Sequence, residues 1–340
     1  MKIIYLHPES TFRTKLRSDT LWGIICWAIR NVYGNDELEN LLKTYTAGKP
    51  EFIISSTFPF FEIEGKKYHF LPKPNLPETY IEQDAVPRKT KIQNAKNRKK
   101  LKKVQQLELT DYVTFISQPK KTQDIIQNIA FGEQKNTLLI KSDSIPHNTI
   151  NRLHGGTLKL KNESGQLFHV DEYYFQLISE KKEDSFDIDE PKGLFFLVKG
   201  NTEKLEGALR FLNHIGYGGD RNTGKGKFYY EIKDFNIQEP EDYNAVTNLS
   251  LYYPTEDEIK QFKGNPLFNY QIEERQGFLG FNNNYNNSLK PITSMFVEGS
   301  VFPKIDQEFY GQNKIVIPKS EKIDHNVFQF GYGFMIKIKI

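Results

Sequence analysis

Residues 202–235 read TEKLEGALRFLNHIGYGGDRNTGKGKFYYEIKDF. Residues 202–213 predict a helix, because their apolar side chains recur on one helical face, and residues 227–235 predict a strand. Between them lies a glycine loop, residues 216–226, with five glycines in eleven positions beside Arg221 and Lys225. Glycine adopts positive φ at little cost, and free backbone N–H groups beside cations favour phosphate. The loop is therefore the first candidate binding site.

Two nucleotide-binding motifs do not fit this loop. Residues 219–225 have the spacing of a P-loop, but Gly226 follows where that motif requires Ser or Thr, and the helix and strand are in the reverse order. A dinucleotide fingerprint fails because Arg221 occupies the position of its third glycine. The loop therefore indicates phosphate binding of another kind, and an ordinary long turn is the alternative.

The composition limits the classes of function. The chain has 340 residues, enough for one large or two smaller domains, and its net charge of +3 means that any nucleic-acid signal must be local. A single cysteine, Cys26, excludes a disulfide within the chain and a cysteine-based zinc site. The N-terminus lacks the apolar region of a signal peptide. We expect a cytoplasmic protein with no cofactor, no metal and no membrane partner.

Two further segments carry polar residues that suit RNA. After a predicted strand at residues 2–6, a basic loop leads into a helix that we expect to be capped by Ser18 or Asp19. The candidate phosphate ligands of this loop and of the helix start are Arg13, Lys15, Arg17 and Ser18. The second segment, HNTINRLHGG at residues 147–156, offers groups that stack on unpaired bases or reach phosphates, namely His147, Asn148, Arg152 and His154. Simple helix capping and solvated polar side chains are the alternatives.

A third basic segment, residues 86–103, has no acidic residue. Such a segment is typical either of a solvated stretch or of contact with a nucleic-acid backbone, and its role stays open.

The order of predicted elements indicates an α+β fold. Over residues 1–236, a strand–helix–strand unit is followed later by a second strand–helix–strand unit. This is the order of a split βαβ, ferredoxin-like (RRM-like) domain with long insertions at about 35–180. A second, smaller ferredoxin-like domain is expected over residues 237–340.

Signals for catalysis are weak. His7 follows the first predicted strand and could act as the general base of a metal-independent endoribonuclease, but no second catalytic group pairs with it in the sequence. Gly218-Gly219-Asp220 is only part of a polymerase-type GGDD, because Arg221 replaces the second carboxylate. We therefore expect no enzyme; the endoribonuclease, and a purely structural bridge between protein partners, remain alternatives.

Several segments together resemble one family. LRSDTLWGIICWAIR (16–30), FLPKP (70–74), HNTINRLHGG, the glycine loop and GFLGFNNNYNNSLKPITSMFVEGSVF (277–302) are similar to the RAMP superfamily of CRISPR proteins, most closely to subunit four of the type III-A Csm effector complex.

The resemblance implies two ferredoxin-like domains and a non-catalytic role in antiviral defence. It implies that the chain holds the 5′ tag of the CRISPR RNA (crRNA) and docks both a large polymerase-like subunit and a backbone RAMP subunit. The RNA-holding elements of the family correspond to residues 13–18, to residues 147–154, and to the glycine loop at Gly216, Gly218, Gly219, Arg221, Thr223, Gly224 and Lys225. RAMP relatives that process precursor RNA use a histidine-based site, and only His7 lies near a comparable place.

Overall fold

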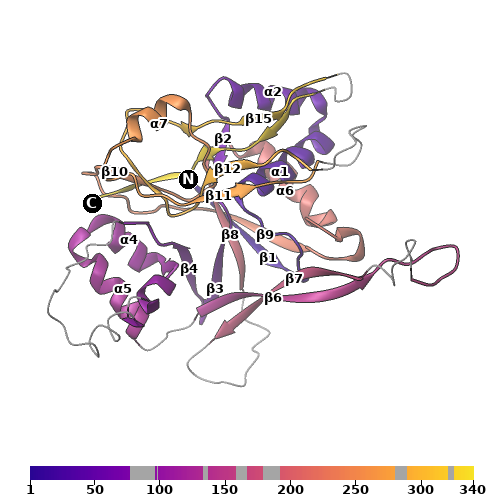
Figure 1. Cartoon of the computed structure of the whole chain (residues 1–340), viewed down its shortest axis with the longest axis horizontal. Helices are drawn as coiled ribbons and strands as arrows, with labels where there is room; N and C mark the ends of the chain where they lie inside the picture. The colour runs from indigo at the N-terminus through magenta and orange to yellow at the C-terminus, as the bar shows by residue number, and fades with distance from the viewer. Residues whose placement is uncertain are drawn as a thin grey trace.

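The structure, a computed structural model, describes residues 1–76, 96–97, 99–132, 137–157, 167–178, 192–279, 289–320 and 325–340. Most of the basic segment 86–103 lies outside these residues, so its role is not addressed by the structure. Figure 1 shows one body with a long hairpin projecting from it. No helix in the described ranges is long and apolar enough to cross a membrane.

A seven-stranded sheet forms the N-terminal part. Strand β1 (Lys2–Pro8) runs antiparallel to both of its neighbours, β8 (Lys192–Gly200) and β9 (Phe228–Asp234). The order β9-β1-β8 is the one that a split βαβ unit requires. The sheet continues through β2 (Phe52–Ile54), β3 (Phe58–Ile63), β4 (Lys66–Pro72) and β5 (Gln106–Glu108).

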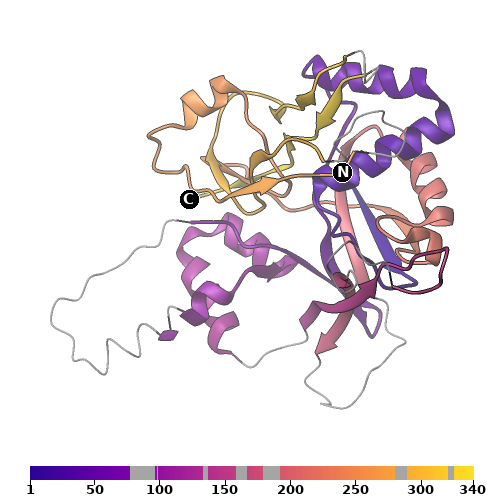
Figure 2. The ribbon, with the colours of Figure 1, turned by 45° about the vertical axis from the view of Figure 1, so that its right-hand side comes forward.

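Helices α1 (Ser18–Tyr33) and α6 (Glu203–Ile215) pack against each other beside this sheet (Figure 2). α6 buries Leu205, Leu209 and Leu212 on one face, as its periodicity predicts. α1 differs from expectation at its start, because Arg17 is the N-cap residue and no side chain caps it. The predicted cap by Ser18 or Asp19 is therefore wrong.

The segments inserted between these elements form a helix beside α1, a separate group of helices, and a hairpin (Figure 1). The helices are α2 (Asn35–Thr46), α4 (Leu109–Ser117), the short η1 (Pro119–Lys121) and α5 (Thr122–Phe131). Strands β6 (Thr137–Asn148) and β7 (Leu167–Ile178) pair along their whole length to form the β6–β7 hairpin, which projects from the body in Figure 1.

The C-terminal part contains a three-stranded sheet, several two-stranded ones and one short helix. The elements are β10 (Ala245–Asn248), α7 (Glu256–Phe262), β11 (Ile272–Arg275), β12 (Thr293–Phe296), β13 (Val301–Pro303), β14 (Tyr310–Gly311), β15 (Lys314–Ile317), β16 (Val327–Gln329), β17 (Tyr332–Gly333) and β18 (Met335–Ile338). The main sheet has the order β13-β10-β18. No four-stranded sheet forms among the described C-terminal residues, so the second ferredoxin-like domain stays a prediction.

One apolar core joins the two parts. Trp22 of α1 stacks on Phe330 with ring centroids 5.4 Å apart, and the Tyr332 hydroxyl donates to the Tyr45 carbonyl oxygen at 2.6 Å. Lys199 of β8 donates from Nζ to the Met335 carbonyl oxygen at 2.8 Å. These buried contacts hold the C-terminal part firmly on α1 and β8.

Candidate nucleic-acid interface

The glycine loop connects α6 to β9 and packs tightly against protein. Gly226 has a φ of +66°, and a Cβ there would lie 2.1 Å from the Tyr217 carbonyl oxygen. Gly218 has a φ of +77°, and its Cβ would lie 2.5 Å from Thr14 Oγ1. Only glycine fits both the conformation and the space at these positions. The sequence favours glycines that leave room for a ligand, but at these two positions protein atoms occupy that space.

The glycine loop contacts the β1–α1 loop, residues 9–17. The Gly226 N–H donates to the Thr11 carbonyl oxygen at 2.9 Å, and the Gly219 N–H donates to Thr14 Oγ1 at 3.1 Å. The β1–α1 loop also pairs with β7, because Phe12 and Tyr173 exchange backbone hydrogen bonds of 3.1 and 2.7 Å. The glycine loop, the β1–α1 loop and the β6–β7 hairpin therefore meet at one place.

Arg13 links all three segments. Its guanidinium forms an ion pair with Asp220 of the glycine loop, and its Nη2 lies 3.1 Å from Nε2 of His147 on β6. Its side chain is only 12% exposed. His147 in turn stacks on Phe168 of the hairpin, with centroids 5.6 Å apart. Arg13 and His147 therefore brace the junction, and little of the Arg13 charge faces solvent.

Lys225 has a similar bracing role. Its Nζ forms an ion pair with Glu172 of β7 and donates to Thr11 Oγ1 at 2.9 Å. Hydrogen bonds from Lys225 and then Thr11 lower the pKa of the Glu172 carboxyl, whose side chain is 8% exposed. Lys225 stays a predicted RNA ligand, but its ammonium pairs with a carboxylate that no sequence pattern indicated.

Most N–H groups of the glycine loop also have protein acceptors. Those of residues 216, 217, 219 and 223–226 donate within the loop, to α6 or to the β1–α1 loop. Among the described residues, the N–H groups of 218 and 220–222 have no acceptor. Because the loop folds back on itself, the expected long row of free N–H groups is reduced to that of residue 218 and those of residues 220–222, at the start of the one-turn helix η2 (Arg221–Thr223).

Several predicted residues do remain at the surface around this junction. The guanidinium of Arg221 is exposed and has no ion-pair partner among the described residues. The exposed Lys15 places Nζ 4.9 Å from the centre of the Tyr173 ring. The predicted site residues with exposed positions are Lys15, Asn148, Arg152, His154, Gly219, Arg221 and Thr223, whereas Gly218 and Gly224 are half-buried.

The 147–156 segment is not a single loop. His147 and Asn148 are the last residues of β6, and Asn148 Nδ2 donates to Thr157 Oγ1 at 2.9 Å. Arg152 and His154 lie in the turn that follows, beside Leu153, which is 88% exposed. The hairpin therefore places cationic, imidazole and apolar groups beyond the junction, where no described residue covers them.

Two predicted ligands and one glycine are turned inward. Arg17 binds Glu298 and, at 2.6 Å, Glu273, both in the C-terminal part. Ser18 is fully buried, and its Oγ accepts a hydrogen bond from the Leu251 N–H at 2.8 Å. Gly216 is also buried. Arg17 and Ser18 join the two parts of the molecule, and an RNA contact by the Ser18 side chain is wrong, since the C-terminal part covers it.

His7 is buried on the sheet. It stacks on Tyr229 with centroids 4.3 Å apart, and burial lowers the pKa of its imidazole. Neither ring nitrogen has a hydrogen-bond partner among the described residues, and Nε2 lies 3.8 Å from Glu231. This environment favours the neutral ring and gives it little access to a substrate.

Comparison with known proteins defines the class. The chain matches the model of the RAMP superfamily over residues 8–229, which is more than half of the sequence, so it belongs to that superfamily. Residues 241–338 match the CRISPR Csm4 C-terminal domain. Within the superfamily the chain is therefore a Csm4 subunit, a component of type III CRISPR effector complexes, and the family predicted from sequence is confirmed.

Individual relatives agree with this assignment. The chain is 26% identical over 260 residues to the CRISPR system Cms protein Csm4 of Thermococcus onnurineus, covering 75% of this chain and 76% of that protein. It is 22% identical to the protein of the same name from Methanocaldococcus jannaschii, covering 94% and 89%.

Solved structures share the mixed α/β fold. A chain from the Csm3–Csm4 subcomplex of the type III-A CRISPR-Cas interference complex has a TM-score of 0.59 at 17% identity, covering 100% of both chains. A chain from the Csm1–Csm4 cassette in complex with cA4 has a TM-score of 0.58 at 19% identity, covering 100% and 98%.

Proposed function

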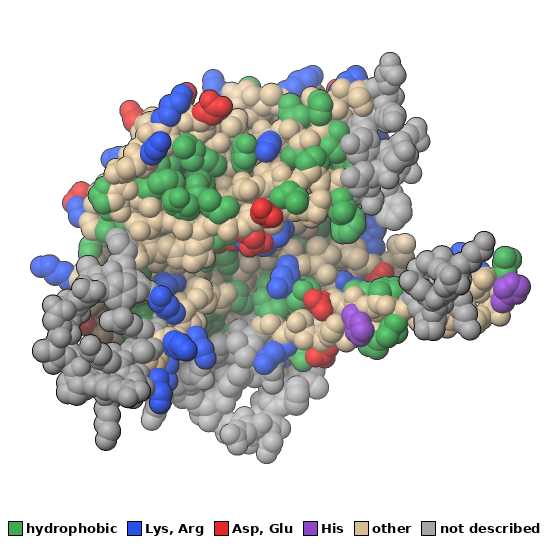
Figure 3. All heavy atoms as spheres, in the orientation of Figure 1, with side chains coloured by type: hydrophobic (Ala, Val, Ile, Leu, Met, Phe, Trp, Pro, Cys, Tyr) green, Lys and Arg blue, Asp and Glu red, His purple; other side chains and the backbone are tan. Residues whose placement is uncertain are grey.

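We propose that this chain is the non-catalytic RNA-binding subunit of a type III-A CRISPR interference complex and that it holds the 5′ tag of the crRNA in antiviral defence. The observation that supports this proposal is the junction of three segments, where the glycine loop, the β1–α1 loop and the β6–β7 hairpin are tied together. On the face shown in Figure 3, Lys and Arg side chains border the hollowed band between the C-terminal part and the hairpin, with Asp and Glu side chains among them.

The residues of the junction divide into two groups. Arg13 and Lys225 are neutralised within the protein, so they position the loops. Arg221 and Lys15 are exposed, and we assign to them the phosphate contacts that fix the path of the strand. The hairpin turn carries Arg152 and His154 beside an exposed leucine, groups that stack on or hold splayed bases.

We further propose two protein partners. Similar chains occur in solved complexes with Csm1 and with Csm3. We infer that this chain likewise docks a large polymerase-like subunit and a backbone RAMP subunit, with its N-terminal part forming a ferredoxin-like domain and its C-terminal part a second, smaller one.

The main test is retention of guide RNA. An Arg221→Ala, Lys15→Ala double variant of the assembled complex should copurify less crRNA. Retention should also depend less on salt, with a slope lower by about one unit for each phosphate that is no longer neutralised. Lys49→Ala removes an exposed lysine that follows α2, in a segment separate from the junction, and serves as the matched control. Undiminished occupancy across a salt titration would contradict the proposal.

Two rival functions have their own readouts. The buried, neutral His7 argues against an endoribonuclease, since a general base must reach the substrate hydroxyl. Site-specific cleavage of labelled precursor RNA in EDTA, abolished in His7→Ala, would favour that rival. Ultraviolet crosslinking that detects no RNA at residues 216–226 would favour a purely structural bridge.

A further inference from the structure

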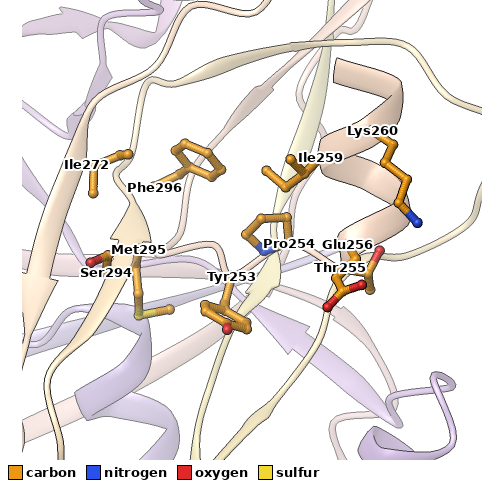
Figure 4. A pocket seen from close by; sticks show the side chains of 10 residues that line it. All are labelled: Tyr253, Pro254, Thr255, Glu256, Ile259, Lys260, Ile272, Ser294, Met295 and Phe296. Carbon is orange, nitrogen blue, oxygen red and sulfur yellow. The ribbon is translucent and has the colours of Figure 1, made fainter. Parts of the chain in front are cut away.

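An apolar groove lies in the C-terminal part, between α7 and the β11–β12 pair. It has a volume of about 460 Å³, and its apolar lining consists of Tyr253, Pro254, Ile259, Ile272, Met295 and Phe296. Figure 4 shows Ile272, Phe296 and Met295 along one side and Ile259 with Pro254 along the other. Figure 3 shows hydrophobic side chains gathered over this region of the surface.

The groove is open, with Met295 and Phe296 buried at its floor and Ile272 exposed at its rim. Ile272 is 56% exposed, and Tyr270, whose ring contacts Phe296 at a centroid distance of 4.9 Å, is 45% exposed. Exposed apolar surface that gathers in one place marks a contact with another molecule. A groove of this volume accepts a few aliphatic or aromatic side chains.

Strand β11 presents this wall because its side chains alternate. Glu273 and Arg275 point toward the N-terminal part, where Arg275 binds Asp19 at 3.1 Å and Glu273 binds Arg17. Ile272 and Glu274 consequently face the other way. The wall is therefore attached to the N-terminal part by ion pairs on its reverse side.

The charges around the groove indicate the occupant. Glu256 on α7 lines the groove, and Glu274 on β11 pairs in register with Ser294, which also lines it. Both glutamates are exposed and have no cation partner among the described residues. Lys260 is paired with Asp257 at 2.9 Å, and Lys314 lies 4.9 Å from the centre of the Tyr253 ring. Two unpaired carboxylates beside an apolar surface repel an RNA backbone and attract a segment whose apolar anchor is flanked by cations.

We propose that this groove docks a polypeptide segment of a partner subunit, one that inserts one or two aliphatic or aromatic side chains and carries Lys or Arg on either side of them. The proposal rests on the proposed function in one respect, because it takes the chain to work as a subunit of a larger complex. It assigns the groove to protein, and it leaves the RNA to the junction of the glycine loop and the β6–β7 hairpin.

A photocrosslinking residue at Ser294, which lines the groove, tests the occupant in the assembled complex with its guide RNA. The same probe at Lys49, an exposed position outside the groove, is the control. We expect mass spectrometry to identify, at Ser294 only, a partner segment with an apolar residue within a few positions of Lys or Arg. A crosslink to RNA, to a second copy of this chain or within this chain, or none above the control, would overturn the proposal.

Variants of the two walls test the same surface by affinity. Ile272→Asp should weaken copurification of the crosslinked subunit at least tenfold, whereas Ile272→Met should retain it; Glu274→Lys should weaken it through charge alone. Because Ile272 and Glu274 are exposed, these changes should leave the thermal unfolding midpoint unchanged, which separates a docking defect from a folding defect. Full copurification of both charged variants would refute docking. The readout is separate from RNA retention, so failure of the RNA proposal would not move it.

Discussion

The two cations of the glycine loop should respond to substitution in opposite ways. Lys225 is held between Glu172 and Thr11, whereas Arg221 has no partner among the described residues. Lys225→Met should therefore lower the free energy of unfolding, and Arg221→Ala should lower only the affinity for RNA. From sequence alone the two cations have equivalent roles, so the contrast tests the structure directly.

The magnitude follows from the contacts of Glu172. Removing the Lys225 ammonium leaves a carboxylate that is 8% exposed with one hydroxyl donor. Removing a hydrogen bond to a charged group costs about 1.5–3 kcal/mol. Since Glu172 lies midway along a projecting hairpin, where water is close, we expect about 2 kcal/mol for Lys225→Met. Adding Glu172→Gln should recover about half of that loss, because the neutral amide no longer needs the cation.

Equilibrium unfolding in urea, followed by the fluorescence of Trp22 and Trp27, measures the first effect. Fluorescence anisotropy of a labelled guide RNA at several salt concentrations measures the second. Arg221→Ala should change the free energy of unfolding by less than about 0.5 kcal/mol while lowering the salt slope by about 1. If Lys225→Met left stability unchanged, or if Arg221→Ala destabilised the chain, the assignment of brace and ligand would be refuted.

Three further predictions concern the frame of the site. Burial, and to a lesser extent the charge of Lys67, lowers the pKa of His69 from 6.5 to about 4. As pH falls below 6.5, the unfolded state therefore binds a proton before the folded state does, and the free energy of unfolding should drop by about 3 kcal/mol by pH 4. Urea unfolding midpoints measure this loss, which should be smaller in His69→Gln. Gly226→Ala should cost more than about 2 kcal/mol because its Cβ meets a carbonyl oxygen, whereas Gly219→Ala, with 3.6 Å of clearance, should be nearly neutral in thermal unfolding. Arg17→Ala should lower the free energy of unfolding by about 3 kcal/mol, because it leaves the Glu298 carboxylate, which is 12% exposed, without its cation. The Arg17 guanidinium donates to both oxygens of that carboxylate, which a lysine cannot do, so full stability in Arg17→Lys would contradict this contact.

Local features of the chain were predictable because they depend on neighbouring residues. The strand expected at residues 2–6, the helix at 202–213 and the strand at 227–235 correspond to β1, α6 and β9 within about two residues. Their periodicity reflects one buried face, which is a local property. The start of α1 was misjudged, because the Ser18 hydroxyl suits a helix cap by local pattern, whereas its actual partner is the distant Leu251 N–H.

The sequence by itself determined which segments carry suitable chemistry: a glycine-dense loop, a basic loop before a helix and an Asn/Arg/His segment. Only the tertiary structure decided which of their charges remain available. Arg13 and Asp220 are 207 residues apart and Lys225 and Glu172 are 53 apart, so no local pattern reports either pair. A cation beside a buried carboxylate serves as a brace, and one that faces solvent can bind phosphate. That distinction depends on long-range register, which periodicity does not encode.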